Sequence, residues 1–326
     1  MKKRIVSGMR PTGKMHLGHL HGALDNWKRL QNEYECFYFI ADWHALTTEY
    51  ANSGIIREST LDILIDWMSI GLDPDVATFF IQSHIQEHTE LHLVFSMITP
   101  LPWLERTPTY RELLKELSQK DLHTYGFLGY PVLQAADILM YMANGVPVGE
   151  DQAPHVELTR EIARRFNNIY TEVFPEPETL LAPTSKILGL DRRKMSKSYD
   201  NAIFLTDTND EIHAKVSSMI TDPQRARRTD PGDPDFCNVF SFHEIYTSPE
   251  TVKQIHDDCH NAGIGCVECK KLMAENLCVA LDPIRMKRKE LESDIDRVKT
   301  IIEKGNNRAK SIAKETMVKV KEAIGI

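Results

Sequence analysis

The sequence His16-Leu17-Gly18-His19 lies between a short apolar segment, Arg4-Ile5-Val6, and a run with helical periodicity. The residues between the two, Ser7 to Lys14, include glycine and proline and are typical of a loop. In the later run, apolar residues recur at helical spacing: Leu20, Ala23, Leu24, Trp27 and Leu30. The chain is therefore predicted to open with a strand, a loop and a helix, the order found in parallel α/β folds.

The start of this helix is a candidate phosphate site. Unpaired backbone N–H groups and the positive end of the helix dipole face outward there. The imidazoles of His16 and His19 can donate hydrogen bonds to the same phosphate, and Gly18 allows a nucleotide to approach the backbone closely. Taken alone, however, two histidines at a helix start are more often a solvated cap.

A second polar loop far downstream, Lys194-Met195-Ser196-Lys197-Ser198, favours the phosphate site over the solvated cap. Two lysines in such a loop can neutralise the outer phosphates of ATP. The loop by itself could equally be a solvated basic segment. Together, the two motifs resemble the paired signatures of the class I aminoacyl-tRNA synthetases.

The composition excludes several classes of protein. The chain has 326 residues, of which 42% are hydrophobic and 26% charged, with a net charge of −8, so it is not a globally basic nucleic-acid binder. It has no apolar run of about 18 residues and no signal peptide, so we expect no membrane association and a cytoplasmic location. In that compartment six cysteines indicate metal binding, redox chemistry or burial rather than disulfides.

The pattern along the chain predicts an α/β first part and a mainly helical second part. Apolar runs at 36–44, 77–83 and 146–148 read as further strands. Helices are expected at 55–70, 87–98, 109–117, 130–141, 154–166, 208–220, 248–260, 267–281 and 285–324, the last interrupted at 305–307.

The expected helix at 130–141 has an informative face. Tyr130, Gln134, Asp137 and Tyr141 follow one another at spacings that place them on the same side. A carboxylate inside an apolar helix is costly to bury without a donor, and an indole N–H would be such a donor. The alternative is that Asp137 caps another element or meets water.

Three segments, 7–13, 130–139 and 146–152, are similar to those of the tryptophanyl-tRNA synthetases of bacterial length, and the match covers most of the chain. The resemblance implies a Rossmann-like parallel-sheet catalytic domain over 1–200. It also implies an α-helical anticodon-binding domain over 201–326, whose last helix can pack back on the first domain. The implied reaction joins L-tryptophan to ATP, with Mg²⁺, and transfers the tryptophanyl group to tRNA(Trp). A homodimer is also implied.

The resemblance also implies roles for particular residues. The implied tryptophan pocket consists of Val6, His44, Tyr130, Gln134, Asp137, Val146, Val148 and Gln152. Within it, Asp137 would accept the indole N–H and Gln152 would hold the amino group. The implied ATP site consists of Arg10, Pro11, Thr12, Gly18, His19, Gly149, Glu150, Asp151, Ile187, Lys194, Met195, Ser196, Lys197 and Ser198. Since the carboxylate of tryptophan is already ionised, catalysis is expected to be charge stabilisation by His16, His19, Lys194 and Lys197.

Four cysteines, Cys237, Cys259, Cys266 and Cys269, form a second candidate site. The last two are separated by two residues, a spacing that presents two thiolates to one metal centre. A subset of bacterial tryptophanyl-tRNA synthetases is similar here, and this implies a 4Fe-4S cluster. Zinc is the next choice, and four unrelated buried thiols are the alternative to any metal. Because these residues are distant in sequence from both ATP motifs, we expect no part for them in adenylation.

Two other functions stay open on the sequence alone. One is a tyrosyl-type synthetase, because a glutamine at the position of Gln134 also occurs in that group. The other is a non-catalytic synthetase-like paralogue that binds RNA or senses tryptophan, although the intact motifs argue against it. The basic stretch 285–289 is a candidate RNA contact in an otherwise acidic chain.

Overall fold

A parallel β-sheet organises the first of two units, and in the described part of the chain it has five strands in the order β3-β2-β1-β4-β5. The strands are β1 Arg4–Met9, β2 Glu35–Ile40, β3 Thr78–Ile81, β4 Gly145–Val148 and β5 Glu178–Leu181. The computed structural model describes residues 2–107, 110, 121–182 and 187–326. The predicted helix at 109–117 lies outside the described residues, except for residue 110. The predicted parallel α/β class is confirmed, whereas strand β5 was not predicted.

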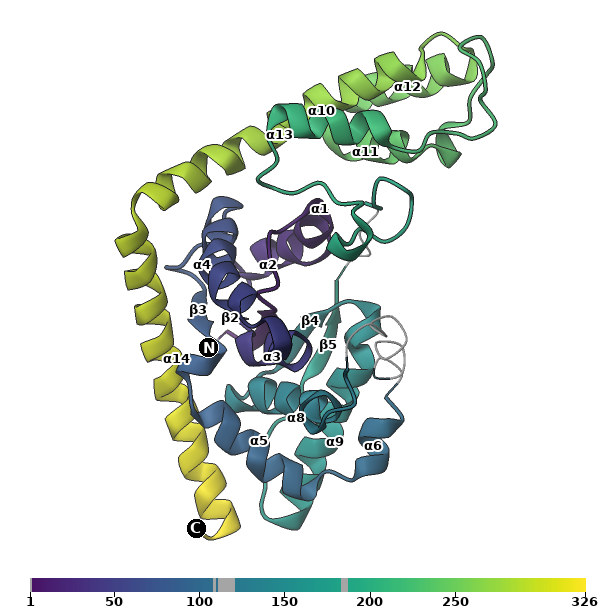
Figure 1. Cartoon of the computed structure of the whole chain (residues 1–326). Coiled ribbons are helices and arrows are strands. Elements are labelled where there is room, and N and C mark those ends of the chain that lie inside the picture. Colours follow the sequence, from purple (N-terminus) through teal and green to yellow (C-terminus); the bar gives the residue numbers. More distant parts are fainter. Residues whose placement is uncertain (1, 108–109, 111–120, 183–186) are drawn as a thin grey trace. The chain divides into compact units, whose positions relative to one another are not determined.

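The sheet belongs to a unit formed by Met1–Gly13, Asp25–Pro183 and Leu291–Ile326, here called the sheet unit. Its helices surround the strands (Figure 1). They are α2 Asp25–Leu30, α3 Asp42–Glu49, α4 Gly54–Ser69, α5 Glu87–Ile98, α6 Leu101–Glu105, α8 Tyr125–Met140, α9 Ala153–Ile169 and α14 Ile295–Ile324. The predicted helix at 87–98 agrees with α5 at both ends. Helix α8 begins five residues earlier than predicted, so Pro131 lies inside it rather than in its first turn.

Both faces of the sheet are covered, which explains why β2 is almost continuously apolar. Alternate side chains point to opposite faces. Tyr38 stacks on Trp27 of α2, with ring centroids 4.3 Å apart. Phe37 and Phe39 belong instead to the large core cluster that also contains residues of α5, α8, α9 and α14.

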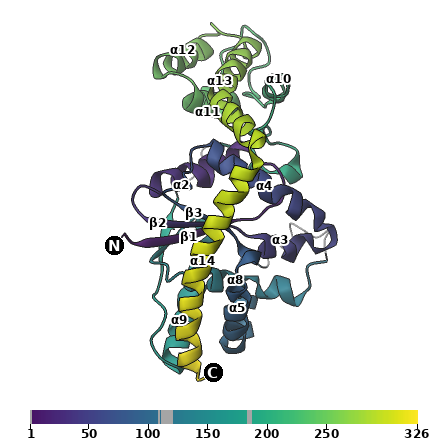
Figure 2. The ribbon, with the colours of Figure 1, turned by 90° about the vertical axis from the view of Figure 1, so that its left-hand side faces the viewer.

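Helix α14 covers the outer edge of the sheet, along β3 (Figure 2). The predicted interruption at 305–307 is wrong, because the helix continues through Gly305. A Cβ at this position would lie 1.8 Å from the carbonyl oxygen of Phe79, so only glycine allows this close approach. The side-chain oxygen of Asn306 accepts a hydrogen bond from the backbone N–H of Ile81 at 2.9 Å, which satisfies a donor of the edge strand.

The second unit, here called the helical unit, consists of Lys14–Leu24 and Thr184–Glu290. Its main helices are α1 Leu17–His19, the π-helical turn η1 Leu20–Leu24, α10 Asn209–Ser218, α11 Asn238–Tyr246, α12 Pro249–His260 and most of α13 Cys266–Ser293. A capping box begins α10, because Thr208 and Glu211 exchange hydrogen bonds. Helix α11 was not predicted. Among the described residues, no helix has the length and apolar character needed to cross a membrane.

Candidate active site

Asp137 of α8 lies at the centre of a buried polar cluster in the sheet unit. Its carboxylate is fully buried and accepts hydrogen bonds from His44 of α3 at 2.8 Å and His88 of α5 at 2.6 Å. The side-chain nitrogen of Gln82 lies 2.8 Å from each carboxylate oxygen. The sequence identified Asp137 and His44, but Gln82 and His88 were missed because their contacts with Asp137 are made only by the fold.

These donors keep Asp137 ionised. Burial by itself would raise the pKa of the carboxyl, but hydrogen bonds from His44 and His88 outweigh that cost and lower the pKa to about 2. The orientation of Gln82 is also fixed, because its oxygen accepts from the backbone N–H of Trp43 at 3.2 Å. Its amide nitrogen must therefore face Asp137. The cluster presents an acceptor-only carboxylate in an apolar surrounding.

The other residues predicted for the tryptophan pocket also belong to the sheet unit. Val6 and Val146 are buried in the large core cluster, and Val148 packs against it. Tyr130 forms a hydrogen bond with His155 at 3.1 Å, a histidine that sequence reasoning did not identify. Gln134 is partly buried on α8, the helix of Asp137. Gln152 ends the turn after β4 and donates to Asp151 at 3.1 Å.

In the helical unit, the fold joins the two signature motifs directly. The backbone N–H of Leu17 donates to Ile203 and that of Leu205 donates to Met15, both at 3.0 Å. These bonds attach the segment after 194–198 to the segment that begins at Met15. A Cβ at Gly18 would lie 3.3 Å from the Cβ of Met195, so the absence of a side chain lets the motifs meet.

The rings of the two motif histidines lie against each other at an angle of 35°, and both are neutral. Their ring centroids lie 3.7 Å apart, and Nδ1 of His19 accepts from the backbone N–H of His16 at 3.1 Å. Burial lowers the pKa of His16 to about 4, with a smaller contribution from the charge of Lys197. Burial, His16 and Lys197 together lower that of His19 well below its ordinary range. Neutral rings can donate to a phosphate without adding charge, so the lysines are the cationic groups of this site.

The loop at 194–198 is held by side chains within it and on either side of it. The oxygen of Asn201 accepts from the backbone N–H of Ser196 at 2.8 Å, and its nitrogen donates to Asp191 at 2.7 Å. Met195 is buried and anchors the loop. Ser196 caps the short turn η5 Lys197–Tyr199 by accepting from Ser198. Ile187, a predicted residue of the ATP site, is buried in the same unit.

The remaining predicted ATP residues belong to the sheet unit. Arg10 follows β1 and lies within electrostatic reach of Glu49 and Tyr130. The backbone N–H of Thr12 donates to the carbonyl of Arg10 at 3.0 Å, so the chain turns at Pro11. After β4, the carboxylate of Asp151 lies over Gly149, where a Cβ would be only 2.7 Å from its oxygen. Glu150 is exposed in this turn.

Comparisons with known proteins agree with this geometry. Residues 1–281 match the family model for class I tRNA synthetases of the W and Y type. The tryptophan–tRNA ligase of Thermotoga maritima is 51% identical over 325 residues, with 99% of each chain covered. The chain belongs to the tryptophan–tRNA ligases. The ligase of Aquifex aeolicus is 45% identical, with 99% of this chain and 100% of that protein covered.

A solved structure supports the family assignment. The tryptophanyl-tRNA synthetase of Campylobacter jejuni, in complex with ADP and tryptophan, superposes with a TM-score of 0.91 at 32% identity. The superposition covers 99% of this chain and all of that one. As a member of the tryptophan–tRNA ligases, the chain is a class I aminoacyl-tRNA synthetase with a Rossmann-like sheet, as predicted.

The four cysteines predicted to bind metal are neighbours in the helical unit. Burial raises the pKa of the Cys269 thiol to about 12, with smaller contributions from the neighbouring Cys237, Cys259 and Cys266. The guanidinium of Arg225 lies 3.8 Å from the sulfur of Cys259. Among the described residues, no group of three or more His, Cys, Asp or Glu side chains is arranged to hold a metal ion. The fold therefore gathers the thiols, but the predicted coordination shell is not shown.

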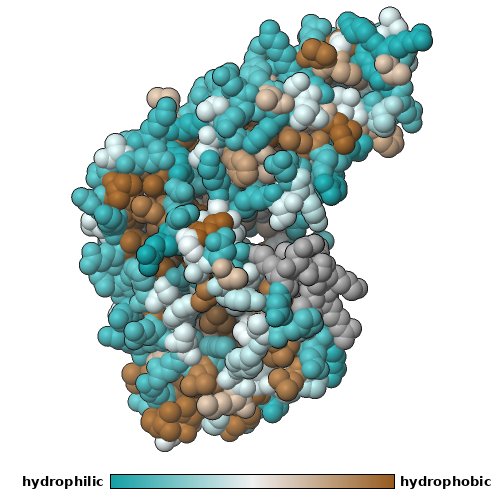
Figure 3. Space-filling view, in the orientation of Figure 1, coloured by the Kyte–Doolittle hydropathy of each residue, from teal (hydrophilic) through white to brown (hydrophobic). Residues whose placement is uncertain are grey.

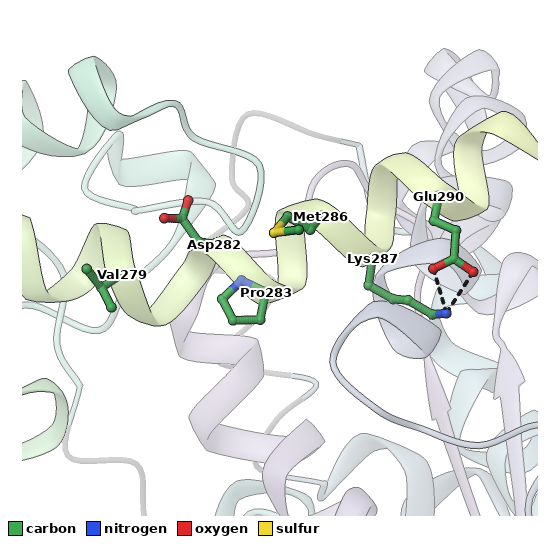
Figure 4. A pocket seen from close by; sticks show the side chains of 6 residues that line it. All are labelled: Val279, Asp282, Pro283, Met286, Lys287 and Glu290. Carbon is green, nitrogen blue, oxygen red and sulfur yellow. Dashed lines mark hydrogen bonds and ion pairs between the residues drawn. The ribbon is translucent and has the colours of Figure 1, made fainter.

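A shallow hollow on α13 contains none of the residues predicted for the tryptophan, ATP or metal sites (Figure 4). Its lining consists of Val279, Asp282, Pro283, Met286, Lys287 and Glu290. Lys287 pairs with Glu290 at 2.9 Å, and the nearby Arg285 donates to the carbonyl of Asp207 at 2.7 Å. Arg285 and Lys287 of the basic stretch 285–289 thus already have partners within the protein.

Proposed function

We propose that the chain activates L-tryptophan with ATP and transfers it to tRNA(Trp). Two kinds of observation support this: close relatives over the full length are tryptophan–tRNA ligases, and one related structure holds ADP and tryptophan. The single observation that carries the choice of amino acid is the buried, ionised carboxylate of Asp137. An indole N–H is a donor with no acceptor capacity, and it is suited to a group that only accepts.

In the proposed pocket Asp137 accepts the indole N–H, and the ring lies among Val6, His44, Tyr130, Gln134, Val146 and Val148. Gln152 holds the amino group. His44 and His88 each donate to one carboxylate oxygen, and the amide nitrogen of Gln82 lies 2.8 Å from both oxygens. In the proposed pocket the indole N–H shares the carboxylate with these donors, and the burial of the carboxylate makes a substrate that cannot donate there costly to bind.

The proposed reaction needs charge stabilisation more than acid–base chemistry. The ionised carboxylate of tryptophan attacks the α-phosphate of ATP, and pyrophosphate leaves. His16 and His19 donate hydrogen bonds to phosphate oxygens, while Lys194 and Lys197 offset the charge that develops on the departing pyrophosphate. Mg²⁺ bound to the triphosphate would supply further charge neutralisation. The turns at 10–12 and 149–151, with Ile187 and 194–198, contact the nucleotide.

For the cysteine site we propose a 4Fe-4S cluster, with zinc as the alternative. Four thiols that influence each other's charge provide the soft donor set that either centre requires. Because the pKa values of Cys237, Cys259 and Cys269 are raised, a metal centre would have to displace their protons on binding. Such a centre would cross-link α12, α13 and the segment before α11.

We also propose a cytoplasmic homodimer in which residues 201–326 recognise the anticodon. The support for a second copy is the apolar surface of α5 and α6, where Leu93, Met97 and Leu101 are 58%, 74% and 57% exposed. Figure 3 shows apolar side chains gathered over α5. Exposed apolar side chains clustered in this way are typical of protein interfaces.

The experiment that tests the proposed function is pyrophosphate exchange with each of the twenty amino acids, followed by charging of tRNA(Trp). We expect exchange with tryptophan alone. Faster exchange with tyrosine would favour a tyrosyl-type enzyme, and absence of exchange with every amino acid would favour a non-catalytic paralogue. Exchange without charging would contradict the second step.

A further inference from the structure

The two histidines that contact Asp137 are not equivalent. His44 is 9% exposed, whereas His88 is completely buried at the start of α5. His44 donates to one carboxylate oxygen and His88 to the other. His88 is therefore the donor furthest removed from solvent, and its contact with Asp137 cannot be replaced by water.

The second ring nitrogen of His88, which does not contact Asp137, also has a hydrogen-bond partner. This nitrogen, Nε2, lies 2.7 Å from the hydroxyl of Tyr141, which is also fully buried at the end of α8. Since a carboxylate only accepts, Nδ1 of His88 carries the proton that is donated to Asp137. In the neutral ring Nε2 is then an acceptor, and the hydroxyl of Tyr141 donates to it.

The surroundings hold this arrangement in one orientation. The ring centroids of Phe39, Phe80 and Tyr141 lie 6.3, 6.0 and 5.4 Å from that of His88. Phe80 and Phe39 stack at 5.4 Å, so the imidazole is confined between aromatic rings. A chain of hydrogen bonds from Tyr141 to His88 to Asp137 therefore holds the carboxylate in one orientation.

We propose that His88, with Tyr141 behind it, is a positioning residue for tryptophan selection, which directs Asp137 toward the indole N–H without touching the substrate. The inference rests on the proposed role of Asp137 as the indole acceptor. It goes beyond that role by assigning the discrimination of the pocket to a pair of residues in the core of the sheet unit.

The test compares tryptophan with its benzothiophene analogue, in which sulfur replaces the indole N–H. In wild type, kcat/KM in pyrophosphate exchange should favour tryptophan by on the order of 10⁴-fold, as in sites built around one buried hydrogen bond. His88→Leu should reduce this preference to roughly 10²-fold by lowering kcat/KM for tryptophan alone. His88→Asn, whose amide nitrogen can take the place of Nδ1, should retain most of the preference.

Tyr141→Phe is the milder variant and keeps the aromatic ring. We expect it to reduce the preference by about tenfold with an unchanged KM for ATP. Equal losses for both amino acids in the His88 and Tyr141 variants, or an unchanged preference, would overturn the positioning role. If wild type itself does not distinguish the analogue from tryptophan, the proposed role of Asp137 fails instead.

Discussion

The charge state of His243 in α11 affects the stability of the helical unit. Its ring is fully buried and contacts Thr247 at 2.8 Å and the carbonyl of Cys269 at 3.2 Å. Burial lowers its pKa to about 4, against the hydrogen bond to Cys269, which raises it. Below pH 6.5 the unfolded chain therefore binds a proton that the folded chain does not, and stability decreases as the pH falls toward 4.

We predict that His243→Gln weakens this pH dependence. Between pH 7 and pH 5, wild type should lose up to about 2 kcal/mol of unfolding free energy through this residue, and the variant should lose correspondingly less. Urea unfolding at the two pH values measures the difference. Removal of an exposed histidine, His260→Gln, is the control and should retain the wild-type dependence. An equally steep dependence in His243→Gln would contradict the prediction.

Lys197 is the second residue with a clear expected effect. Its charge already lowers the pKa values of His16 and His19, so it lies within reach of the groups that would hold phosphate. Lys197→Ala should slow adenylation by about 100-fold or more and change tryptophan affinity little, because its charge matters most in the transition state. Single-turnover kinetics and tryptophan binding separate the two effects.

The control for this variant is the exposed Lys271, which pairs with Glu275 at 4.0 Å on α13. Lys271→Ala should leave both measurements unchanged. Parallel losses of tryptophan binding and rate in Lys197→Ala would show that the loop has a structural role instead.

At the scale of elements, the packing of helix α14 against strand β3 depends on Gly305. A side chain at Gly305 would collide with the carbonyl of Phe79 and separate Asn306 from Ile81. We predict that Gly305→Ala lowers the unfolding free energy by roughly 1–3 kcal/mol, although alanine favours a helix. Gly126 of α8 has nothing within 4 Å of its Cβ position, so Gly126→Ala should be neutral or slightly stabilising. Thermal unfolding of both variants checks this; equal melting temperatures would contradict it.

At the scale of the whole molecule, the cysteines and the ATP motifs belong to one structural unit. Asn238, next to Cys237, donates to the carbonyl of Gly189 at 2.8 Å, and Arg192 donates to the carbonyl of Phe236 at 2.5 Å. These bonds anchor the segment that leads into 194–198. The expectation that the cysteines play no part in adenylation rested on their distance in sequence, and these contacts provide a physical connection.

We predict that Cys266→Ser removes the metal centre and weakens ATP use. Anaerobically purified wild type should contain iron and sulfide in roughly 4:4 ratio, and the variant should contain neither. Its KM for ATP in exchange should rise roughly 5- to 10-fold, because the anchored segment loosens. Cys278→Ser is the control, since Cys278 is buried on α13 outside the four-cysteine site. Wild-type protein without iron or zinc would refute the site, and zinc alone would refute the cluster.

The sequence by itself determined the features that depend on local pattern. Apolar periodicity predicted most strands and helices. The motifs at 16–19 and 194–198 indicated a class I synthetase, and the segments 7–13, 130–139 and 146–152 indicated the tryptophanyl family. Composition and spacing also singled out Asp137 and the four cysteines. Such features are readable because neighbouring residues share one helix face, one strand or one loop.

Only the tertiary structure decided which distant residues meet. His88 and Gln82 reach Asp137 across 49 and 55 residues, and Leu205 bonds to Met15 across most of the chain. Gly305 looked like a helix break because glycine is a poor helix former, but close contact with β3 requires it. The periodicity of apolar residues predicts which side of a helix or strand is buried. The order of the strands and the packing of the helices between them decide which buried histidines contact the carboxylate of Asp137.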